Sequence, residues 1–369
     1  MFAERMKKID SSGIRKVFEL AKNMKDPINL SIGQPDFDVP DILKNEAVKA
    51  IESGFNKYTV TQGIDPLRKN VEKELDKKGI FYESSLITSG VSGGLLLAFM
   101  ALIDPGDEVI IADPYFVMYT HLVSLMGGVP RYVDTYPHFR LLRSDIEKNI
   151  TKKTKLIIIN SPSNPTGTVY TREELTMVAD LAREHGIIVL SDEIYDTFTY
   201  DGDYTHMGSL YNNTITLNGF SKSYSMTGWR IGYAAGPKDI IAEMTKLQQY
   251  TFVCAPSFAQ KAAVNAFDFS MEPYIEDYKK KRDIVYNGLK DAFTVEKPHG
   301  AFYIFPEAPD GNASRFVERA IDNNVLIIPG NVFSQKDTHF RISYAVNDET
   351  LKRGVDQLNA LREKVESEK

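Results

Sequence analysis

The sequence is poor in cysteine and lacks long apolar runs, and these absences exclude several classes of protein. Its 369 residues include one cysteine, Cys254, which excludes an internal disulfide and favours a reducing compartment. No apolar run approaches the roughly 18 residues that a membrane helix needs, and residues 1–16 lack the apolar core of a signal peptide. The formal net charge of −6 argues against a nucleic-acid-binding surface and against a polybasic membrane anchor. We therefore expect a soluble, cytoplasmic protein that binds neither nucleic acid nor membranes.

Two common cofactor motifs and a metal-binding pattern are also missing. No G-x-G-x-x-G follows a strand-like run, and no G-x-x-x-x-G-K-[ST] occurs. The six histidines are scattered, without a pair at metal-ligand spacing. The sequence therefore predicts no metal site, and it disfavours a nicotinamide-dependent dehydrogenase.

What the sequence does contain is a series of strand-length apolar runs separated by helical patterns. Continuous Ile, Val and Leu runs of this length are typical of strands buried on both faces, as in a parallel sheet. Between two of them, Thr171 and Glu174 form a capping box ahead of an apolar helical stripe. Strand, helix, strand in series predicts an α/β domain with a mostly parallel central sheet. The predicted strands are 86–89, 108–112, 155–160, 187–192, 214–218 and 230–235.

After about residue 270 the pattern changes to charged helical segments and short strands. The predicted strands are 301–306, 325–329 and 339–345, and the chain ends in an amphipathic helix. We predict three parts: an N-terminal segment over 1–40 that packs on the small domain and the active site, a large domain over 41–270, and a smaller α+β domain over 271–369. The apolar face of the last helix is predicted to consist of Leu351, Val355, Leu358, Leu361 and Val365.

Lys222 lies in an unusual setting, between serines and shortly before Arg230. In a partly desolvated site beside another cation, a lysine amine loses its proton more easily and can form a Schiff base with an aldehyde. By itself this stretch also fits an exposed pair of charges.

Other polar groups follow the predicted strands. Asn164 comes after the strand at 155–160, and Asp192 and Tyr195 come at the end of the next strand. The small-residue turn in 88–95 would aim backbone N–H groups at an anion. Because ligands bind outside the carboxyl ends of such strands, these groups are predicted to converge at one sheet edge. Taken singly, Asn164 also fits a simple turn, and Asp192 fits a helix cap.

In this arrangement the sequence resembles the fold-type I pyridoxal-5′-phosphate (PLP) aminotransferases of class I/II, the group that includes aspartate and aromatic aminotransferases. The ordered motifs are N-P-T-G at 164–167, D-E-x-Y at 192–195 and S-K-x-x-x-x-x-G-x-R at 221–230. The resemblance extends from SIGQPDF at 31–37 to HFRIS at 339–343. It implies the large and small domains of a PLP-transferase fold.

The resemblance also implies the roles of the residues near the cofactor ring. Lys222 would hold PLP covalently and, once freed by substrate, act as the general base. Asp192 would bind the pyridinium nitrogen. Asn164 and Tyr195 would donate hydrogen bonds to the phenolate oxygen, and Asn164 would also adjoin the substrate. Phe116 would stack on the ring; Tyr115 is the competing choice.

The phosphate would be held by Arg230, by the Ser221 hydroxyl and by N–H groups at Val91 and Ser92. The nearby Ser223 and Ser225 add hydroxyls that also suit a phosphate. In the family a further serine often stands three positions before the lysine. Here that position is Gly219, so the sequence predicts one phosphate contact fewer.

The remaining implied roles concern the substrate and a second subunit. Arg341 would grip the substrate α-carboxylate bidentately, and Gly33 would let the N-terminal segment approach the substrate. Tyr58 resembles a tyrosine that reaches the phosphate from the neighbouring subunit, which would make the protein a homodimer with shared active sites. The alternative for Tyr58 is ordinary core packing.

The sequence therefore predicts a PLP-dependent aminotransferase that moves the amino group of an L-amino acid to a 2-oxo acid by a ping-pong cycle. A PLP-dependent carbon–sulfur β-lyase on the same fold and a non-catalytic PLP-binding regulator remain as alternatives. For a dicarboxylic substrate, Arg5, Lys8 and Arg15 are candidate partners of the distal carboxylate.

Overall fold

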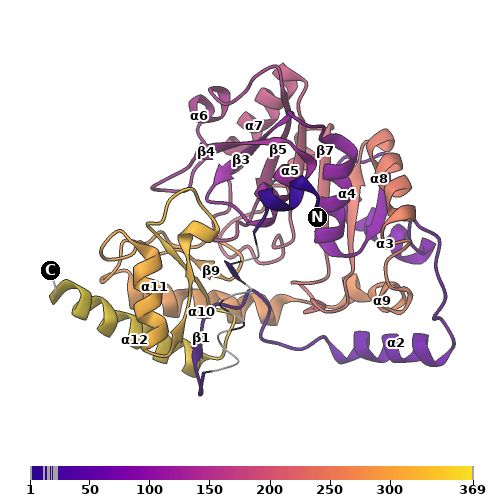
Figure 1. The fold of residues 1–369 in the computed structure, drawn as a ribbon. Helices are drawn as coiled ribbons and strands as arrows, with labels where there is room; N and C mark the ends of the chain where they lie inside the picture. The colour runs from indigo at the N-terminus through magenta and orange to yellow at the C-terminus, as the bar shows by residue number, and fades with distance from the viewer. Residues whose placement is uncertain (1, 11–12, 15–16, 18, 20–23, 368–369) are drawn as a thin grey trace.

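The structure is a computed structural model that describes residues 2–10, 13–14, 17, 19 and 24–367. Figure 1 shows a sheet flanked by helices in the upper part of the view, above the orange and yellow C-terminal elements. The first part of the described chain, in indigo, reaches both regions before it continues into α2.

A seven-stranded sheet forms the larger part, with strand order β2-β8-β7-β6-β5-β3-β4. All neighbouring strands are parallel except β8, which runs antiparallel to β2 and to β7. The mostly parallel α/β sheet predicted from the sequence is thus confirmed. Its strands are β2 (Ser84–Thr88), β3 (Glu108–Asp113), β4 (Val129–Asp134), β5 (Thr154–Asn160), β6 (Ile188–Asp192), β7 (Thr214–Gly219) and β8 (Gly232–Gly236).

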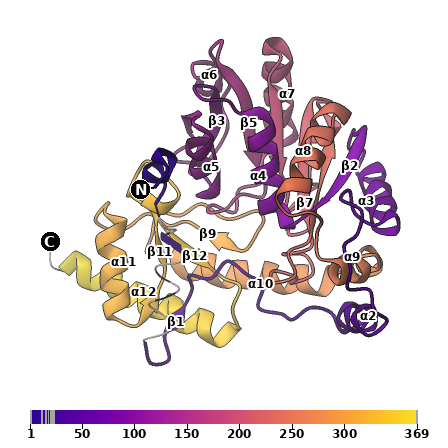
Figure 2. The ribbon, with the colours of Figure 1, turned by 45° about the vertical axis from the view of Figure 1, so that its right-hand side comes forward.

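Both faces of this sheet are covered, which explains its continuous apolar runs. On β5, Leu156 and Ile158 point into a core shared with helices α4, α5 and α8. Ile157 and Ile159, on the opposite face, pack in a core with helix α7. Figure 2 shows α7 and α8 on either side of the strands. The helices that accompany the sheet are α2 (Asp41–Glu52), α3 (Asp65–Lys77), α4 (Gly90–Leu102), α5 (Met118–Met126), α6 (Arg143–Glu147), α7 (Arg172–His185), α8 (Lys238–Tyr250) and α9 (Ser257–Ala263).

Helix α7 begins as the sequence predicts. The Glu174 backbone N–H donates to the Thr171 hydroxyl at 3.2 Å, and the Thr171 N–H donates to the Glu174 carboxylate at 2.7 Å. This capping box satisfies two backbone donors at the start of the helix. Gly186, in a left-handed conformation with φ of 65°, ends it.

The C-terminal part combines three helices with short strands, and one strand of the N-terminal segment joins it. β1 (Ile28–Asn29) pairs in parallel with β10, while β12 lies between β11 and β9 in a second small sheet. The five apolar residues predicted for the last helix are all buried. The remaining elements are η1 (Glu4–Lys8), η2 (Met207–Ser209), η3 (Ala266–Asp268), α10 (Glu272–Leu289), β9 (Tyr303–Ile304), α11 (Ala313–Asp322), β10 (Val325–Leu326), β11 (Ile328–Pro329), η4 (Gly330–Val332), β12 (Phe340–Ser343) and α12 (Asp348–Ser367).

Three local predictions were wrong. The strand predicted over 325–329 is two short strands, β10 and β11, which belong to different sheets. β4 was missed, because this edge strand is largely exposed and contains Pro130 instead of an apolar run. Arg230 precedes β8 with φ of 56°, so the strand predicted from 230 begins two residues later.

In the described part of the chain, no helix combines the length and apolar character needed to span a membrane.

Candidate active site

A cavity of about 350 Å³ opens at the carboxyl ends of the parallel strands. Asn160 at the end of β5 lies in register with Asp192 at the end of β6, and Lys222 follows β7. Eleven of the twelve predicted site residues line this cavity, and Tyr58 is the exception. The eleven are Gly33, Val91, Ser92, Phe116, Asn164, Asp192, Tyr195, Ser221, Lys222, Arg230 and Arg341.

Lys222 projects into the cavity from the turn after β7. Its amine donates a hydrogen bond to the Gly33 carbonyl at 2.7 Å and lies 5.7 Å from the centre of the Tyr195 ring. Loss of hydration, followed by the positive charges of Arg341 and Arg230, lowers the pKa of Lys222 to about 8. The amine is therefore far closer to its nucleophilic, neutral form at physiological pH than an ordinary lysine.

The resemblance implies that Lys222 captures PLP, and the lowered pKa predicts how the rate of this capture depends on pH. Because only the neutral amine attacks an aldehyde, the rate at which PLP-depleted protein captures PLP is expected to rise with pH and to level off above about 8. Stopped-flow absorbance at a series of pH values measures this rate. Arg341→Met removes one of the repelling cations and should move the midpoint upward. A wild-type rate that still rises steeply near pH 10.4, about the ordinary lysine value, would contradict the assignment.

Asp192 faces Lys222 from the end of β6, and its side chain is buried, with the residue 3% exposed. The Tyr119 hydroxyl donates to Asp192 Oδ2 at 2.7 Å, and the Ile194 N–H donates to Oδ1 at 3.3 Å. Burial raises the pKa of Asp192 to about 6, although these two hydrogen bonds oppose the rise. A turn, not a helix, follows the strand, so the alternative of a helix cap is wrong.

Asn164 and Tyr195 line the same cavity as Asp192 and Arg341. The Asn164 side-chain oxygen accepts a hydrogen bond from Arg341 Nη1 at 3.0 Å, which leaves its amide hydrogens as donors. The hydroxyls of Tyr195 and Tyr303 lie 2.8 Å apart. Burial, together with the Tyr303 hydroxyl, holds the pKa of Tyr195 well above its usual value, so Tyr195 keeps its proton.

Arg341 is a buried guanidinium with incomplete partners. The residue is 1% exposed, its Nη2 donates to the Ser31 carbonyl at 2.7 Å, and its buried Nε has no partner. Among the described residues, no carboxylate forms an ion pair with it. A buried cation without a counter-charge is strongly unfavourable, so this geometry suits an incoming carboxylate. Arg341 is therefore part of the buried site and not of the protein surface.

At the other end of the cavity, Arg230 lies beside the start of α4. Its Nη1 donates to the Thr227 carbonyl at 2.9 Å and its Nη2 to the Ser89 carbonyl at 3.5 Å. Gly90 permits this approach, because a Cβ there would lie 2.5 Å from Arg230 Nη2. The N–H groups of Val91 and Ser92, in the first turn of α4, have no acceptor within the helix. Together with the Ser221 hydroxyl, these donors suit an anion.

One prediction about this end of the cavity needs correction. Ser223 and Ser225 do not line the cavity: their hydroxyls donate to Thr197 and to the Phe37 carbonyl. The glycine at 219 has a structural reason, since a Cβ there would lie 2.8 Å from the Cα of Gly232 on the paired strand. A serine at 219 would therefore push the two strands apart.

Phe116, not Tyr115, faces the cavity. Tyr115 instead stacks on Tyr132 at 5.2 Å and accepts a hydrogen bond from Gln335. Tyr58 is 83% exposed, so core packing within this chain is wrong for it. Arg5 and Lys8 do not line the cavity, and Arg15 lies outside the described residues.

Several residues of the cavity were not predicted from the sequence. Tyr119 and Tyr303 are the most important, because their hydroxyls contact Asp192 and Tyr195. Tyr119 follows Phe116 by three residues, about one helical turn, and this spacing was the only local sign that Tyr119 would also face the cavity. The other missed lining residues include Ile14, Ile32, Gln34, Leu95, Asn160, Ile194 and Thr227.

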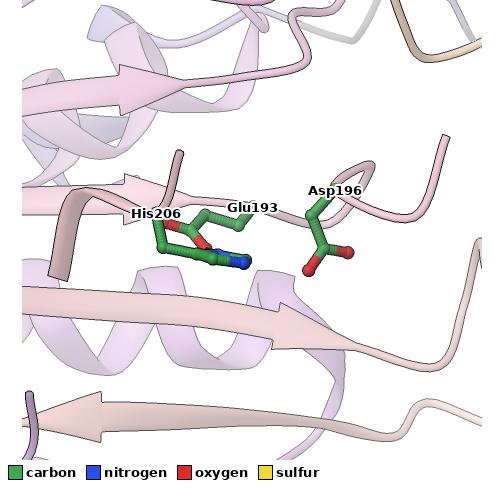
Figure 3. A group of neighbouring side chains, drawn as sticks. All are labelled: Glu193, Asp196 and His206. Carbon is green, nitrogen blue, oxygen red and sulfur yellow. The ribbon is translucent and has the colours of Figure 1, made fainter. Parts of the chain in front are cut away.

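The segment that carries Asp192 and Tyr195 also carries Glu193 and Asp196, and these two carboxylates lie close to His206. Figure 3 shows the imidazole of His206 between the carboxyl groups of Glu193 and Asp196, and the donor atoms of the three lie within 4.8 Å of one another. His206 Nδ1 lies 2.6 Å from Glu193, and the Lys78 amine donates to Asp196 at 2.7 Å. Lys78 thus supplies the cation that pairs with Asp196, while Glu193 accepts hydrogen bonds from the Ser191 hydroxyl and the Met207 N–H.

Removing Lys78 is therefore expected to destabilise the protein strongly. Lys78→Ala leaves the Asp196 carboxylate, whose side chain is 5% exposed, without its partner, and should lower the free energy of unfolding by about 3–5 kcal/mol. Urea denaturation at neutral pH measures this loss. Burial raises the pKa of Asp196, but the opposing effects of Lys78 and His206 are larger together, so the pKa lies below its usual value. The ion pair therefore stabilises the fold at neutral pH, and this stabilisation is lost as the pH falls through the carboxylate range.

The adjacent Lys77 provides the control. It is exposed and pairs at 3.3 Å with Glu74 on the helix surface, so Lys77→Ala should change stability by at most about 1 kcal/mol. Equal effects of the two substitutions would contradict a buried ion pair at Lys78.

The fold and this cavity together define an α/β enzyme whose lysine amine lies between a buried carboxylate and a buried guanidinium. Comparison with known proteins gives the family. The family model "Aminotransferase class I and II" matches residues 25–358, and the chain belongs to that family. It is an aminotransferase, which transfers an amino group between an amino acid and a 2-oxo acid, and PLP is the cofactor that this family uses.

Individual relatives agree with this assignment. The chain is 40% identical to a probable aspartate aminotransferase of Methanocaldococcus jannaschii, over 96% of this chain and 98% of the relative. It is 37% identical to aromatic-amino-acid aminotransferase 2 of Thermococcus litoralis, over 98% of both chains. The solved aspartate aminotransferase of Thermus thermophilus with maleate superimposes with a TM-score of 0.93 at 34% identity, covering 98% of this chain and 99% of the other.

Proposed function

We propose that the cavity binds PLP, with Lys222 as its covalent anchor and as the group that moves the substrate proton. The volume of about 350 Å³ lies in the range of small-molecule sites. When bound, PLP supplies an aldehyde for the amine and an aromatic ring that accepts electrons. The residues of the cavity offer suitable partners for the ring nitrogen, the ring oxygen and the phosphate of this molecule.

At the ring end, Asp192 would hold the pyridine nitrogen, with Tyr119 fixing the orientation of its carboxylate. The amide of Asn164 and the hydroxyl of Tyr195 would serve as donors to the ring oxygen, and Phe116 would offer an aromatic face. At the other end, Arg230, Ser221 and the start of α4 would hold the phosphate. Gly90 supports this fit, since any side chain there would displace the Arg230 guanidinium.

The buried position and the unpaired Nε of Arg341 are the observation that favours an amino-acid substrate. Its free Nε and its buried position favour a carboxylate beside Lys222, and a guanidinium fork binds a carboxylate bidentately. A substrate held there by its α-carboxylate presents its amino group and Cα toward the lysine. Lys222, with its lowered pKa, can then take the proton from Cα.

We also propose that two copies of the chain form the working enzyme. Tyr58 is exposed and lies outside the cavity of its own chain, although it belongs to a motif expected at the phosphate. The same region exposes further large apolar side chains, and exposed apolar surface of this kind is expected at interaction sites. These are Ile42, Val48 and Ile51 of α2 and Val60 in the loop beyond it. Light scattering that gives the mass of one chain at assay concentrations would contradict this proposal.

The reaction is tested by supplying PLP and a panel of L-amino acids together with 2-oxoglutarate. The expected result is that glutamate and the 2-oxo acid of the donor appear in equal amounts, and that formation of more than one equivalent of the 2-oxo acid per enzyme requires the acceptor. A carbon–sulfur β-lyase would instead release pyruvate and ammonia from cystathionine without any acceptor. If that release is the dominant activity, or if no donor yields glutamate, the proposal is wrong.

A further inference from the structure

The segment over residues 31–39 lacks regular secondary structure, yet it covers the reactive amine. It connects β1 with α2, and Figure 2 shows the chain passing along α10 on this path. Arg341 donates to the Ser31 carbonyl, Lys222 to the Gly33 carbonyl and Ser225 to the Phe37 carbonyl. Side chains from other elements therefore hold this segment in place.

Asp36 forms the most extensive of these attachments. Its N–H donates to the Tyr278 hydroxyl at 3.1 Å, and that hydroxyl donates back to Asp36 Oδ1 at 2.8 Å. The Lys281 amine donates to Asp36 Oδ2 at 2.6 Å. Tyr278 and Lys281 are 1% and 5% exposed and lie one turn apart on α10. Charge-assisted hydrogen bonds from buried groups are among the stronger ones, so Asp36 ties the segment firmly to this helix.

The segment has little freedom to shift at Gly33, three residues earlier. A Cβ at Gly33 would lie 2.5 Å from the Tyr303 hydroxyl, so the backbone passes close against that side chain. Tyr303 in turn contacts Tyr195. A movement of the segment would either break the contact between Lys222 and the Gly33 carbonyl or displace Tyr303 and its partner.

We propose that Asp36 is a positioning residue: by locking residues 31–39 to α10, it places the Gly33 carbonyl where it holds the free amine of Lys222. The inference rests on the proposed role of Lys222 as the proton-transfer group. A misplacement of about 1 Å at a reacting group can lower a rate about 100-fold. Loss of the attachment should thus slow the chemical step without weakening PLP binding.

The test compares Asp36→Ala with Asp277→Ala in the full-length, PLP-loaded enzyme. Asp277 is a matched control, because it binds the same Lys281 amine at 2.7 Å and does not touch the segment. Asp36→Ala is expected to lower kcat by about 10–100-fold, with a smaller change in KM and an unchanged Kd for PLP. Asp277→Ala should keep kcat within about twofold of the wild type.

Tyr278→Phe is the second variant, and it decides the question if Asp36→Ala does not fold. It removes only the hydroxyl that binds Asp36 and keeps the ring packed on Phe198 and Phe302. Its kcat should also fall. The inference is overturned if the folded Asp36 and Tyr278 variants keep wild-type kcat, or if Asp277→Ala loses as much activity as Asp36→Ala.

One further measurement separates this inference from the proposed function. Borohydride treatment of the wild-type enzyme fixes PLP to the residue that carries it. If the label is on Lys222 and the Asp36 variants are fully active, only the positioning role fails. If the wild type carries its label elsewhere, the proposed function fails and the positioning role fails with it.

Discussion

Replacing Lys222 with alanine is expected to abolish transamination, with kcat lower by about 10⁴-fold or more. The variant loses both the covalent attachment of the cofactor and the group that takes the substrate proton, and general acid–base catalysis alone typically contributes 10²–10⁴-fold. In the cavity, no other lysine is present among the described residues that could replace it. Production of glutamate from the best donor and 2-oxoglutarate measures the loss.

Lys246→Ala is a suitable control for this experiment. Lys246 is exposed on α8, where it pairs with Glu243, so its substitution should leave activity unchanged. The Lys222 variant should remain folded, because removing a buried amine relieves the cost of its desolvation. Activity within tenfold of the wild type in a folded Lys222→Ala protein would contradict the assignment of the catalytic lysine.

Asp192→Asn is expected to have the second-largest effect, a fall in kcat of about 10²–10³-fold. The substitution preserves shape and, with the amide oxygen toward Tyr119, the hydrogen bond from that hydroxyl, while the weaker bond from the Ile194 N–H is lost. It removes the charge that would keep the pyridine nitrogen protonated. Covalent attachment to Lys222 should persist, so the visible absorption of the bound cofactor should remain. A variant with wild-type kcat would show that this carboxylate does not act on the ring.

The same substitution should stabilise the protein when PLP is absent. Burial raises the pKa of Asp192 to about 6, against about 3.9 in an unfolded chain. Its ionised form therefore destabilises the folded state; the effect is absent below about pH 4, grows between about 4 and 6, and is complete above that range. At pH 8 the PLP-depleted Asn variant should unfold at a higher urea concentration than the wild type. Higher stability together with lower activity is typical of a functional residue.

The sheet and its polar edge could be predicted because both depend on local patterns. Continuous apolar runs mark strands buried on two faces, and β5 and β6 end in register at Asn160 and Asp192. Since parallel strands bring their carboxyl ends to one edge, the residues after each strand converge whatever the details of the loops. The individual roles of these residues came from the family resemblance and not from the patterns alone.

The rest of the site depends on contacts between distant parts of the chain. Tyr303 approaches Tyr195 from the C-terminal part, across 108 positions, and no periodicity of the sequence signals it. Ser223 and Ser225 have the right chemistry for a phosphate, but the turn after β7 directs their hydroxyls elsewhere. The splitting of 325–329 into two strands likewise results from pairing with two different partners, β1 and β12. Composition and spacing do not carry this information.

The most direct test of Lys222 as the covalent anchor of PLP is to locate the cofactor on the chain. The PLP-loaded enzyme is reduced with borohydride and digested, and the peptides are analysed by mass spectrometry. We predict that the phosphopyridoxyl group is found on the peptide containing Lys222, and that an excess of amino donor added before reduction prevents the labelling. A label on a different lysine, or no label on a protein that is active with PLP, would contradict the role of Lys222 as the covalent anchor.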